Sequence, residues 1–316
     1  MSPEAPVMGA WDSAYHSPVL VDEVVLLLGG AKRILDCTLG GGGHSAALLA
    51  SGADVTAIDR DPEAVAEARA RLASHEAAGK FRVILGNFAE ADRLLPDTRQ
   101  KFDGILADLG VSSRQIDDEA RGFSFREGAP LDMRMETTGK ATAAELLNTM
   151  DEEDLIRILR DYADEPRARR LAHEIVRRRE NTPFATSDDL VKAIRGALGA
   201  RSGPGDFARI FQGIRIAVND ELGSLERALP ILRDMLEPNG VLAVIAYHSG
   251  EDRIVKTLMR EWSRDCVCPP RQLQCTCGGK AKGTLINRKA IKTSPAEIER
   301  NPRARSARLR AWRSAA

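Results

Sequence analysis

The stretch Asp36–Ser45, DCTLGGGGHS, places four consecutive glycines directly after a short apolar segment. Residues 33–39, RILDCTL, have the composition of a buried strand, and a helix of small residues is expected after the glycines. A glycine turn at the end of a strand lets a ligand approach the backbone closely, because no Cβ stands in the way. The stretch therefore predicts a strand, a bare turn and a helix, with a ligand beyond the carboxyl end of the strand.

The following segments repeat this alternation. Further strands are predicted at DVTAIDR (54–60), FRVILGN (81–87) and FDGILADLG (102–110). A helix is predicted over 61–79, because Asp61 can cap it, Pro62 suits its first turn and Gly79 suits its end. Strands that alternate with helices predict an α/β fold with a mainly parallel, doubly wound sheet.

The strand pattern then stops for about a hundred residues. Helices are predicted at 165–180, where apolar residues form one stripe, and after Thr186, which forms a capping-box pattern with Asp189. A long helix is predicted from Phe207 to about residue 229. Strands resume at 240–249, a helix follows, and two weaker strands are expected at 283–289 and 306–313. The simplest organisation is a discontinuous sheet domain, residues 1–113 plus 217–316, with an inserted all-helical domain over 114–216.

Length and composition set broad limits. The 316 residues exceed the usual size of one domain, and Lys plus Arg equal Asp plus Glu at 46 each, so global charge indicates no anionic partner. No apolar run approaches the ~20 residues of a membrane span, and the N-terminus lacks the pattern of a signal peptide. We expect a cytoplasmic protein without a membrane partner.

Two cofactors fit the glycine turn. The dinucleotide pattern GxGxxG is met by Gly40 and Gly42 but has Ser45 in place of the third glycine. The S-adenosylmethionine pattern DxGxGxG is met by Asp36, Gly40 and Gly42, with Thr38 in place of the first glycine. Asp36 favours S-adenosylmethionine, because a carboxylate there can face the cationic aminoacyl end. A turn that only packs a helix on a strand is the structural alternative.

Three further residues follow strand ends on the same side. Asp59 can accept hydrogen bonds from ribose hydroxyls of either cofactor, or serve only as a helix cap. Phe88 can stack on an adenine or fill the core. Asp108 is expected to point from the fourth strand into the cleft.

Asp108 also begins the segment DLGVSSRQIDDEARGFSFREGAPLDMRM (108–135), which closely resembles the RsmH (MraW) family of ribosomal RNA small-subunit methyltransferases. The resemblance extends, in order, over HSPVL (16–20), TLGGGGHS (38–45), RIFQGIRIAVNDEL (209–222), HSGEDRIVK (248–256) and NPRARSARLR (301–310). It implies a Rossmann-like class I methyltransferase fold. It also implies methyl transfer from S-adenosylmethionine to the exocyclic N4 amine of cytidine 1402 in 16S rRNA of the small ribosomal subunit.

The resemblance also implies site residues. Its cofactor contacts correspond to Gly42, Gly43, His44, Asp59, Phe88, Asp108 and Gln115. One departure is Gly250, where the family usually has Leu, and looser apolar packing is expected at that point.

The chemistry gives Asp108 a catalytic role. The N4 lone pair of cytosine is conjugated with the ring, so the amine must be aligned with the S–CH3 bond. Positioning alone can contribute several kcal/mol, up to roughly 7–11 in good cases. We expect Asp108, with the Leu109 or Gly110 carbonyl, to accept an amine N–H, and Asp108 or water to take the proton. His16 and His248 are further cleft candidates, and His248 is equally suited to a structural role as a helix cap.

The C-terminal segment is the predicted RNA-binding edge. Residues 280–316 contain eleven Lys and Arg against Glu297 and Glu299, a net charge of about +9. A second arginine cluster over 167–179 is diluted by glutamates and fits a solvated helix face as well. Aromatic residues are only 4%, so recognition by shape and phosphates, with one base turned out, fits better than extended stacking.

Four of the five cysteines lie close together, as Cys266, Cys268, Cys275 and Cys277. They could bind zinc or remain thiols, and the family resemblance requires no metal, so no metal ligand is assigned. Cys37 is expected in the core. The alternative functions are a nicotinamide oxidoreductase, which lacks the third glycine, and a non-catalytic rRNA-binding or ribosome-assembly module. The oligomeric state stays open, a homodimer being one option.

Overall fold

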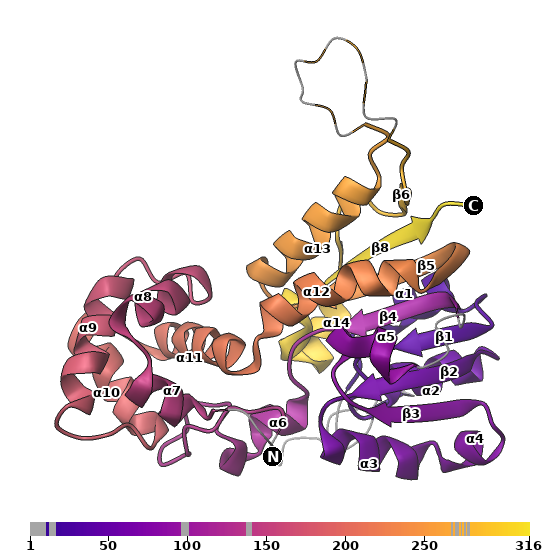
Figure 1. Ribbon diagram of the computed structural model, residues 1–316. Coiled ribbons are helices and arrows are strands. Elements are labelled where there is room, and N and C mark those ends of the chain that lie inside the picture. The colour runs from indigo at the N-terminus through magenta and orange to yellow at the C-terminus, as the bar shows by residue number, and fades with distance from the viewer. Residues whose placement is uncertain are drawn as a thin grey trace. The chain divides into compact units, whose positions relative to one another are not determined.

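The structure, a computed structural model, describes residues 11–12, 17–95, 101–136, 141–266, 268, 272, 274, 276 and 279–316. The chain forms two compact units, Met1–Gly110 with Leu222–Ala316, and Val111–Glu221 (Figure 1). All named strands belong to the first unit, and the named elements of the second are helical. That the two units act as separate domains, divided as the sequence predicts, stays a prediction.

The sheet of the first unit has the order β3-β2-β1-β4-β5-β8-β6, and β7 also pairs with β8. The first five of these strands are parallel, whereas β8 runs antiparallel to β5, β6 and β7. The strands are β1 (Arg33–Asp36), β2 (Asp54–Asp59), β3 (Phe81–Leu85), β4 (Phe102–Asp108), β5 (Leu236–Ala246), β6 (Gly283–Leu285), β7 (Ile291–Lys292) and β8 (Arg308–Ser314). The predicted α/β class with a mainly parallel sheet is therefore confirmed.

Successive strand residues point to opposite faces of the sheet, and an apolar layer buries each face. Ile34 and Leu106 pack in one apolar layer with α1 to α3, while Leu35 and Ile105 pack in the other with α12 and α13. The helices of this unit are α1 (Val21–Leu28), α2 (Gly43–Ala50), α3 (Pro62–Arg71), α4 (Ala73–Ala77), α5 (Ala91–Leu94), α12 (Glu221–Asp234), α13 (Ser249–Trp262) and α14 (Pro295–Arg300), with 3₁₀ turns η1 (Phe88–Glu90) and η3 (Pro302–Ser306). The sheet is thus doubly wound.

The second unit is built on one apolar core shared by α7 to α11. Its elements are α6 (Ser113–Asp117), η2 (Glu119–Arg121), α7 (Ala143–Thr149), α8 (Glu152–Asp161), α9 (Ala168–Arg179), α10 (Ser187–Leu198) and α11 (Pro204–Asn219). In α9 the predicted stripe is buried at Ala168, Leu171, Ala172 and Ile175. The predicted capping box forms at α10, where the Asp189 carboxylate accepts from the Thr186 N–H at 3.0 Å.

The single helix predicted from Phe207 to residue 229 is wrong. Asp220 takes a left-handed conformation with φ of 49°, and this separates α11 from α12. The buried side chain of Asn219 ties the end of α11 to the chain near Met133 and Met135, with hydrogen bonds of 2.7 and 2.8 Å. Apolar periodicity continues across the break, so the pattern alone does not reveal it.

Candidate active site

The strand order changes direction between β1 and β4. The chain leaves β1 toward β2 and β3 on one side, and leaves β4 toward β5 on the other. Such a switch point opens a crevice beyond the carboxyl ends of the two strands, where ligands of open α/β sheets bind. The last residues of β1 and β4 are Asp36 and Asp108, so two carboxylates stand at this crevice.

The glycines after β1 have separate roles. Gly40 and Gly42 have φ of 51° and 74°, in the left-handed region that favours glycine. A Cβ on Gly43 would lie 2.7 Å from the Cγ of Pro18, so glycine there allows close packing. A Cβ on Gly40 would meet nothing within 4 Å. The turn therefore needs glycine at Gly40 and Gly42 for its backbone conformation and at Gly43 for close packing. Beside Gly40 it also leaves open space.

Asp36 is completely buried and is held by the start of the next helix. Its carboxylate accepts from the Ser45 hydroxyl at 2.7 Å and from the Thr38 N–H at 3.2 Å. Burial raises the pKa of Asp36 above its usual range. A nearby cation would favour the ionised form, which fits the aminoacyl end of S-adenosylmethionine. Ser45, which breaks the dinucleotide pattern, is thus the hydrogen-bond partner of Asp36.

Asp59 ends β2 and orders the glycine turn. It accepts from the Gly40 N–H at 2.8 Å and from the Asp61 N–H at 2.9 Å. The N-cap of α3 is Asp61, which accepts from the Glu63 N–H, so Asp59 is not that cap. Burial raises the pKa of Asp59 to about 6. Its carboxylate lies at the end of the strand next to β1, and its contact with a ribose stays a prediction.

Phe88 follows β3 and begins η1, where Asn87 caps the turn by accepting from the Ala89 N–H at 2.9 Å. The Phe88 ring is half-buried and packs against the apolar layer on one face of the sheet. Both sequence interpretations, a stacking surface for adenine and a core residue, remain compatible with this position.

Asp108 is held by two hydrogen bonds and lies close to a third side chain. Its backbone N–H donates to the Thr38 hydroxyl at 2.6 Å, and the Tyr247 hydroxyl donates to its Oδ1 at 2.9 Å. The Nε2 of His44 lies 3.4 Å from its Oδ2, without hydrogen-bond geometry. Thr38, the departure from the first glycine of the pattern, thus joins the β1 turn to the end of β4.

Together these residues fit S-adenosylmethionine. Open space lies beside Gly40, the carboxylate at the end of β1 is buried and that at the end of β2 is half-buried, and His44 is 5% exposed with no hydrogen-bond partner for either ring nitrogen. Buried polar atoms normally have partners, so His44 is consistent with a site that a ligand completes.

Comparison with known proteins identifies the family. The model of the MraW methylase family matches residues 13–315. The chain belongs to the MraW methylase family. A protein of Gemmatimonas aurantiaca called Ribosomal RNA small subunit methyltransferase H is 61% identical over 315 residues, which is 100% of both chains. Proteins of the same name from Heliobacterium mobile and Anaeromyxobacter sp. (strain K) are 45% and 47% identical, over 94% of this chain and 97% and 96% of theirs.

The chain is therefore a methyltransferase with a Rossmann-like fold, and its methyl donor is S-adenosylmethionine. This excludes the nicotinamide oxidoreductase. The residues predicted from the family pattern divide between the two units. Gly42, Gly43, His44, Asp59, Phe88 and Asp108 all lie in the first unit, at or after the carboxyl ends of β1 to β4.

Gln115 lies in the second unit of the methylase. It is buried and belongs to a capping box at α6, in which its Oε1 accepts from the Ser112 N–H at 3.0 Å and the Ser112 hydroxyl accepts from the Gln115 N–H. Its predicted contact with the methyl donor stays a prediction.

Sequence reasoning missed Tyr247, the hydroxyl partner of Asp108. Tyr247 directly precedes His248 at the end of β5, so its place beyond a strand end was the available signal. The structure favours the structural role for His248, which caps α13 through its Nδ1, an acceptor from the Glu251 N–H at 3.4 Å. His16 lies outside the described residues.

Gly250 was expected to loosen packing, and the structure shows the opposite. It lies in the first turn of α13, where an added Cβ would stand 3.2 Å from the His248 ring and 3.3 Å from the Leu222 side chain. The absence of a side chain therefore allows His248 and Leu222 to approach the helix closely.

The basic C-terminal segment is partly neutralised within the fold. Asp252 of α13 accepts two hydrogen bonds from Arg310, at 2.7 and 3.1 Å, and one from Arg308 at 3.3 Å. These ion pairs join β8 to α13. Arg303 and Arg305 in η3 are exposed, and are the better candidates for phosphate contacts.

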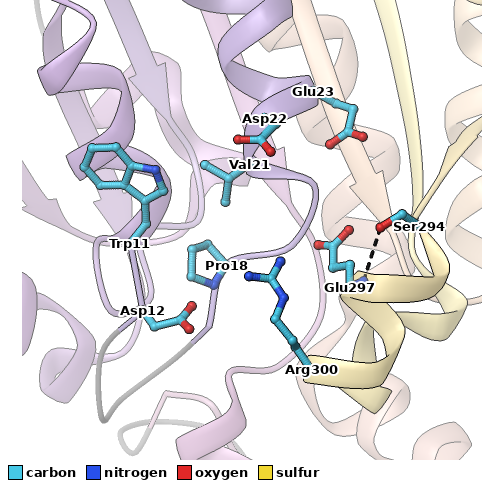
Figure 2. A pocket seen from close by; sticks show the side chains of 9 residues that line it. All are labelled: Trp11, Asp12, Pro18, Val21, Asp22, Glu23, Ser294, Glu297 and Arg300. Atoms are coloured by element: carbon cyan, nitrogen blue, oxygen red, sulfur yellow. Dashed lines mark hydrogen bonds between the residues drawn. The ribbon is translucent and has the colours of Figure 1, made fainter. Parts of the chain in front are cut away.

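A pocket of about 220 Å³ lies elsewhere in the first unit, between α1, α14 and the N-terminal segment (Figure 2). Pro18, which packs on Gly43, is part of its wall. The charged side chains that line it are Asp12, Asp22, Glu23, Glu297 and Arg300. Four acidic groups against one arginine disfavour an RNA phosphate there.

Of the four cysteines for which zinc or free thiols were the alternatives, Cys275 and Cys277 lie outside the described residues. Within the described parts of the chain, no three His, Cys, Asp or Glu residues are grouped so that they could hold a metal ion. Cys37 is buried as predicted, and burial raises the pKa of its thiol. Among the described residues, none of the helices combines the length and the apolar character that a membrane span requires.

Proposed function

We propose that this methylase transfers a methyl group from S-adenosylmethionine to the exocyclic N4 amine of cytidine 1402 in 16S rRNA of the small ribosomal subunit. The observation that carries the proposal is Asp108, a fixed hydrogen-bond acceptor at the switch point of the sheet, on the same edge as the open space beside Gly40. The names of the relatives, small-subunit rRNA methyltransferases, support the RNA substrate.

Each residue has a defined task in this proposal. Asp36 faces the cationic end of the donor, Asp59 accepts from the ribose hydroxyls, and Phe88 lies against the adenine. When bound, S-adenosylmethionine supplies an electrophilic methyl group on a sulfonium. Asp108 accepts one N–H of the cytosine amine, which turns the nitrogen lone pair toward the methyl group and positions it for attack.

Exposed Arg303 and Arg305 would contact phosphates, so that one cytidine can be turned out of the RNA into the crevice. The same proposal includes a contact between Gln115 and S-adenosylmethionine. It also gives the helical unit a role in binding the substrate.

The test uses purified protein, labelled S-adenosylmethionine and small ribosomal subunits that lack the modification. We expect one methyl group per subunit, and mass spectrometry of nuclease fragments should place it on the N4 of cytidine 1402. A methyl group at another base, or on carbon 5 of the same base, would contradict the proposed specificity. Tight binding to the subunit without any methyl incorporation would favour the alternative, a ribosome-assembly module.

A further inference from the structure

His44 is a buried side chain without a hydrogen-bond partner. Its residue is 5% exposed, and neither Nδ1 nor Nε2 forms a hydrogen bond. Leaving such a group unpaired costs about 1–3 kcal/mol, so a buried and unpaired imidazole at a catalytic crevice calls for a functional explanation. A backbone contact to the methyl donor from this turn would not use the ring.

The ring faces Asp108. Nε2 lies 3.4 Å from Oδ2, a separation slightly longer than a hydrogen bond, so the two atoms flank a position that one proton could occupy. The other oxygen, Oδ1, accepts a hydrogen bond from the Tyr247 hydroxyl at 2.9 Å. Burial and the charge of Asp108 raise the pKa of Tyr247 well above its usual range, so this hydroxyl remains a donor.

The charged and titratable groups around the imidazole come from three strands. Asp36 ends β1 and is close enough to His44 for an electrostatic interaction, Asp108 ends β4, and Tyr247 follows β5. Among these, only Asp108 has an oxygen within ion-pair distance of the ring. Asp36 is turned toward Ser45 instead.

We propose that His44 and Asp108 act as a pair that takes up the proton lost by the methylated amine, an inference that rests on the proposed function. The nitrogen lone pair forms the new N–C bond, the S–C bond breaks, and its electron pair remains on sulfur as a neutral thioether. The nitrogen then carries one proton too many. That proton passes to Oδ2 of Asp108 and from there to Nε2 of His44, and it leaves for solvent when the products are released.

The proposed pair predicts a measurable delay between methyl transfer and the release of the proton to solvent. Because the pair is buried, the proton should reach solvent only after methyl transfer. In a single turnover with saturating S-adenosylmethionine and small ribosomal subunits, methyl incorporation is followed by rapid quench, and proton release by a pH indicator in weak buffer. For the wild type we expect proton release to lag behind methyl transfer.

The main variant is His44→Gln. The matched control is His75→Gln in α4, which precedes the edge strand β3. We expect His44→Gln to slow methyl transfer about tenfold and to abolish the lag, and His75→Gln to behave as wild type. His44→Gln with the wild-type rate and the wild-type lag would overturn the pair.

A second variant covers the case in which His44→Gln loses the fold or the donor site. Calorimetric affinity for S-adenosylhomocysteine is measured for every variant. Tyr247→Phe should bind it within about twofold of wild type and should transfer about tenfold more slowly, the effect of losing a hydrogen bond to a charged group. Unchanged transfer by Tyr247→Phe would also overturn the pair. Absence of methylation by the wild type would instead overturn the proposed function itself.

Discussion

Replacing Gly43 by alanine tests the close packing behind the glycine turn. The added Cβ would lie 2.7, 3.0 and 3.1 Å from the Cγ, Cδ and Cβ of Pro18. Pro18 is buried and its ring cannot rotate away, so one of the two segments must move. Overpacking of this kind costs about 1–3 kcal/mol, from which roughly 0.5–1 kcal/mol is regained by replacing glycine in a helix.

Taking the middle of each range, the net loss of stability is about 1 kcal/mol. For a unit of this size that corresponds to a fall in melting temperature of about 2–4 °C. Differential scanning calorimetry of the protein without ligand measures it, and repeating the scan with S-adenosylmethionine shows whether the donor site survives. We expect Gly43→Ala to keep most of the stabilisation by the donor, because the clash lies against Pro18.

Gly40→Ala is the matched control. Its Cβ meets nothing within 4 Å, but its φ of 51° imposes a backbone cost of roughly 1–2 kcal/mol. The new methyl group occupies the space assigned to the donor, so affinity for S-adenosylmethionine should fall at least tenfold by calorimetry. The reasoning is refuted if Gly43→Ala melts with the wild type and Gly40→Ala binds the donor with unchanged affinity.

Three further outcomes are expected. Affinity for S-adenosylmethionine should weaken as the pH falls below about 6, because burial raises the pKa of Asp59 to about 6 and a protonated carboxyl cannot accept from both ribose hydroxyls. Calorimetry from pH 5 to 8 should show this loss of affinity, and an affinity that does not change with pH would argue against the ribose role. Asp252→Asn should destabilise the first unit by about 3 kcal/mol in urea titrations, because it leaves the Arg310 guanidinium, whose side chain is only 11% exposed, without its charge partner. A loss below about 1 kcal/mol would contradict this. Double charge reversal of Arg303 and Arg305 should lower the salt dependence of RNA binding by about one to two counterions, whereas an unchanged slope would exclude η3 from the interface.

Much of the fold was predictable because it depends on local periodicity. The buried strands of the sheet are short apolar segments with turn residues at their ends, and Asp61 with Pro62 marks the start of α3. The break at Asp220 was not predictable, because the apolar pattern continues through it and the cause is a tertiary contact of Asn219.

The sequence predicted which residues lie at the site, but not the contacts between them. Strand order at the switch point brings Asp36 and Asp108 to one edge, and the glycine pattern marks the turn. The contacts that fix Asp108 join residues 70 and 139 positions apart in the chain. The sequence around Thr38 and Tyr247 therefore did not show that they contact Asp108, although Tyr247 follows a strand end. Likewise, the charge count of the C-terminal segment could not show that Asp252 neutralises Arg310.

The most direct measurement is a crystal structure of the methylase with S-adenosylmethionine. We expect the ribose at Asp59, the adenine beside Phe88, and the sulfonium between the turn at Gly40 and the carboxylate of Asp108. Electron density for the donor in another part of the molecule, with this crevice empty, would contradict the assignment of the methyl-transfer site.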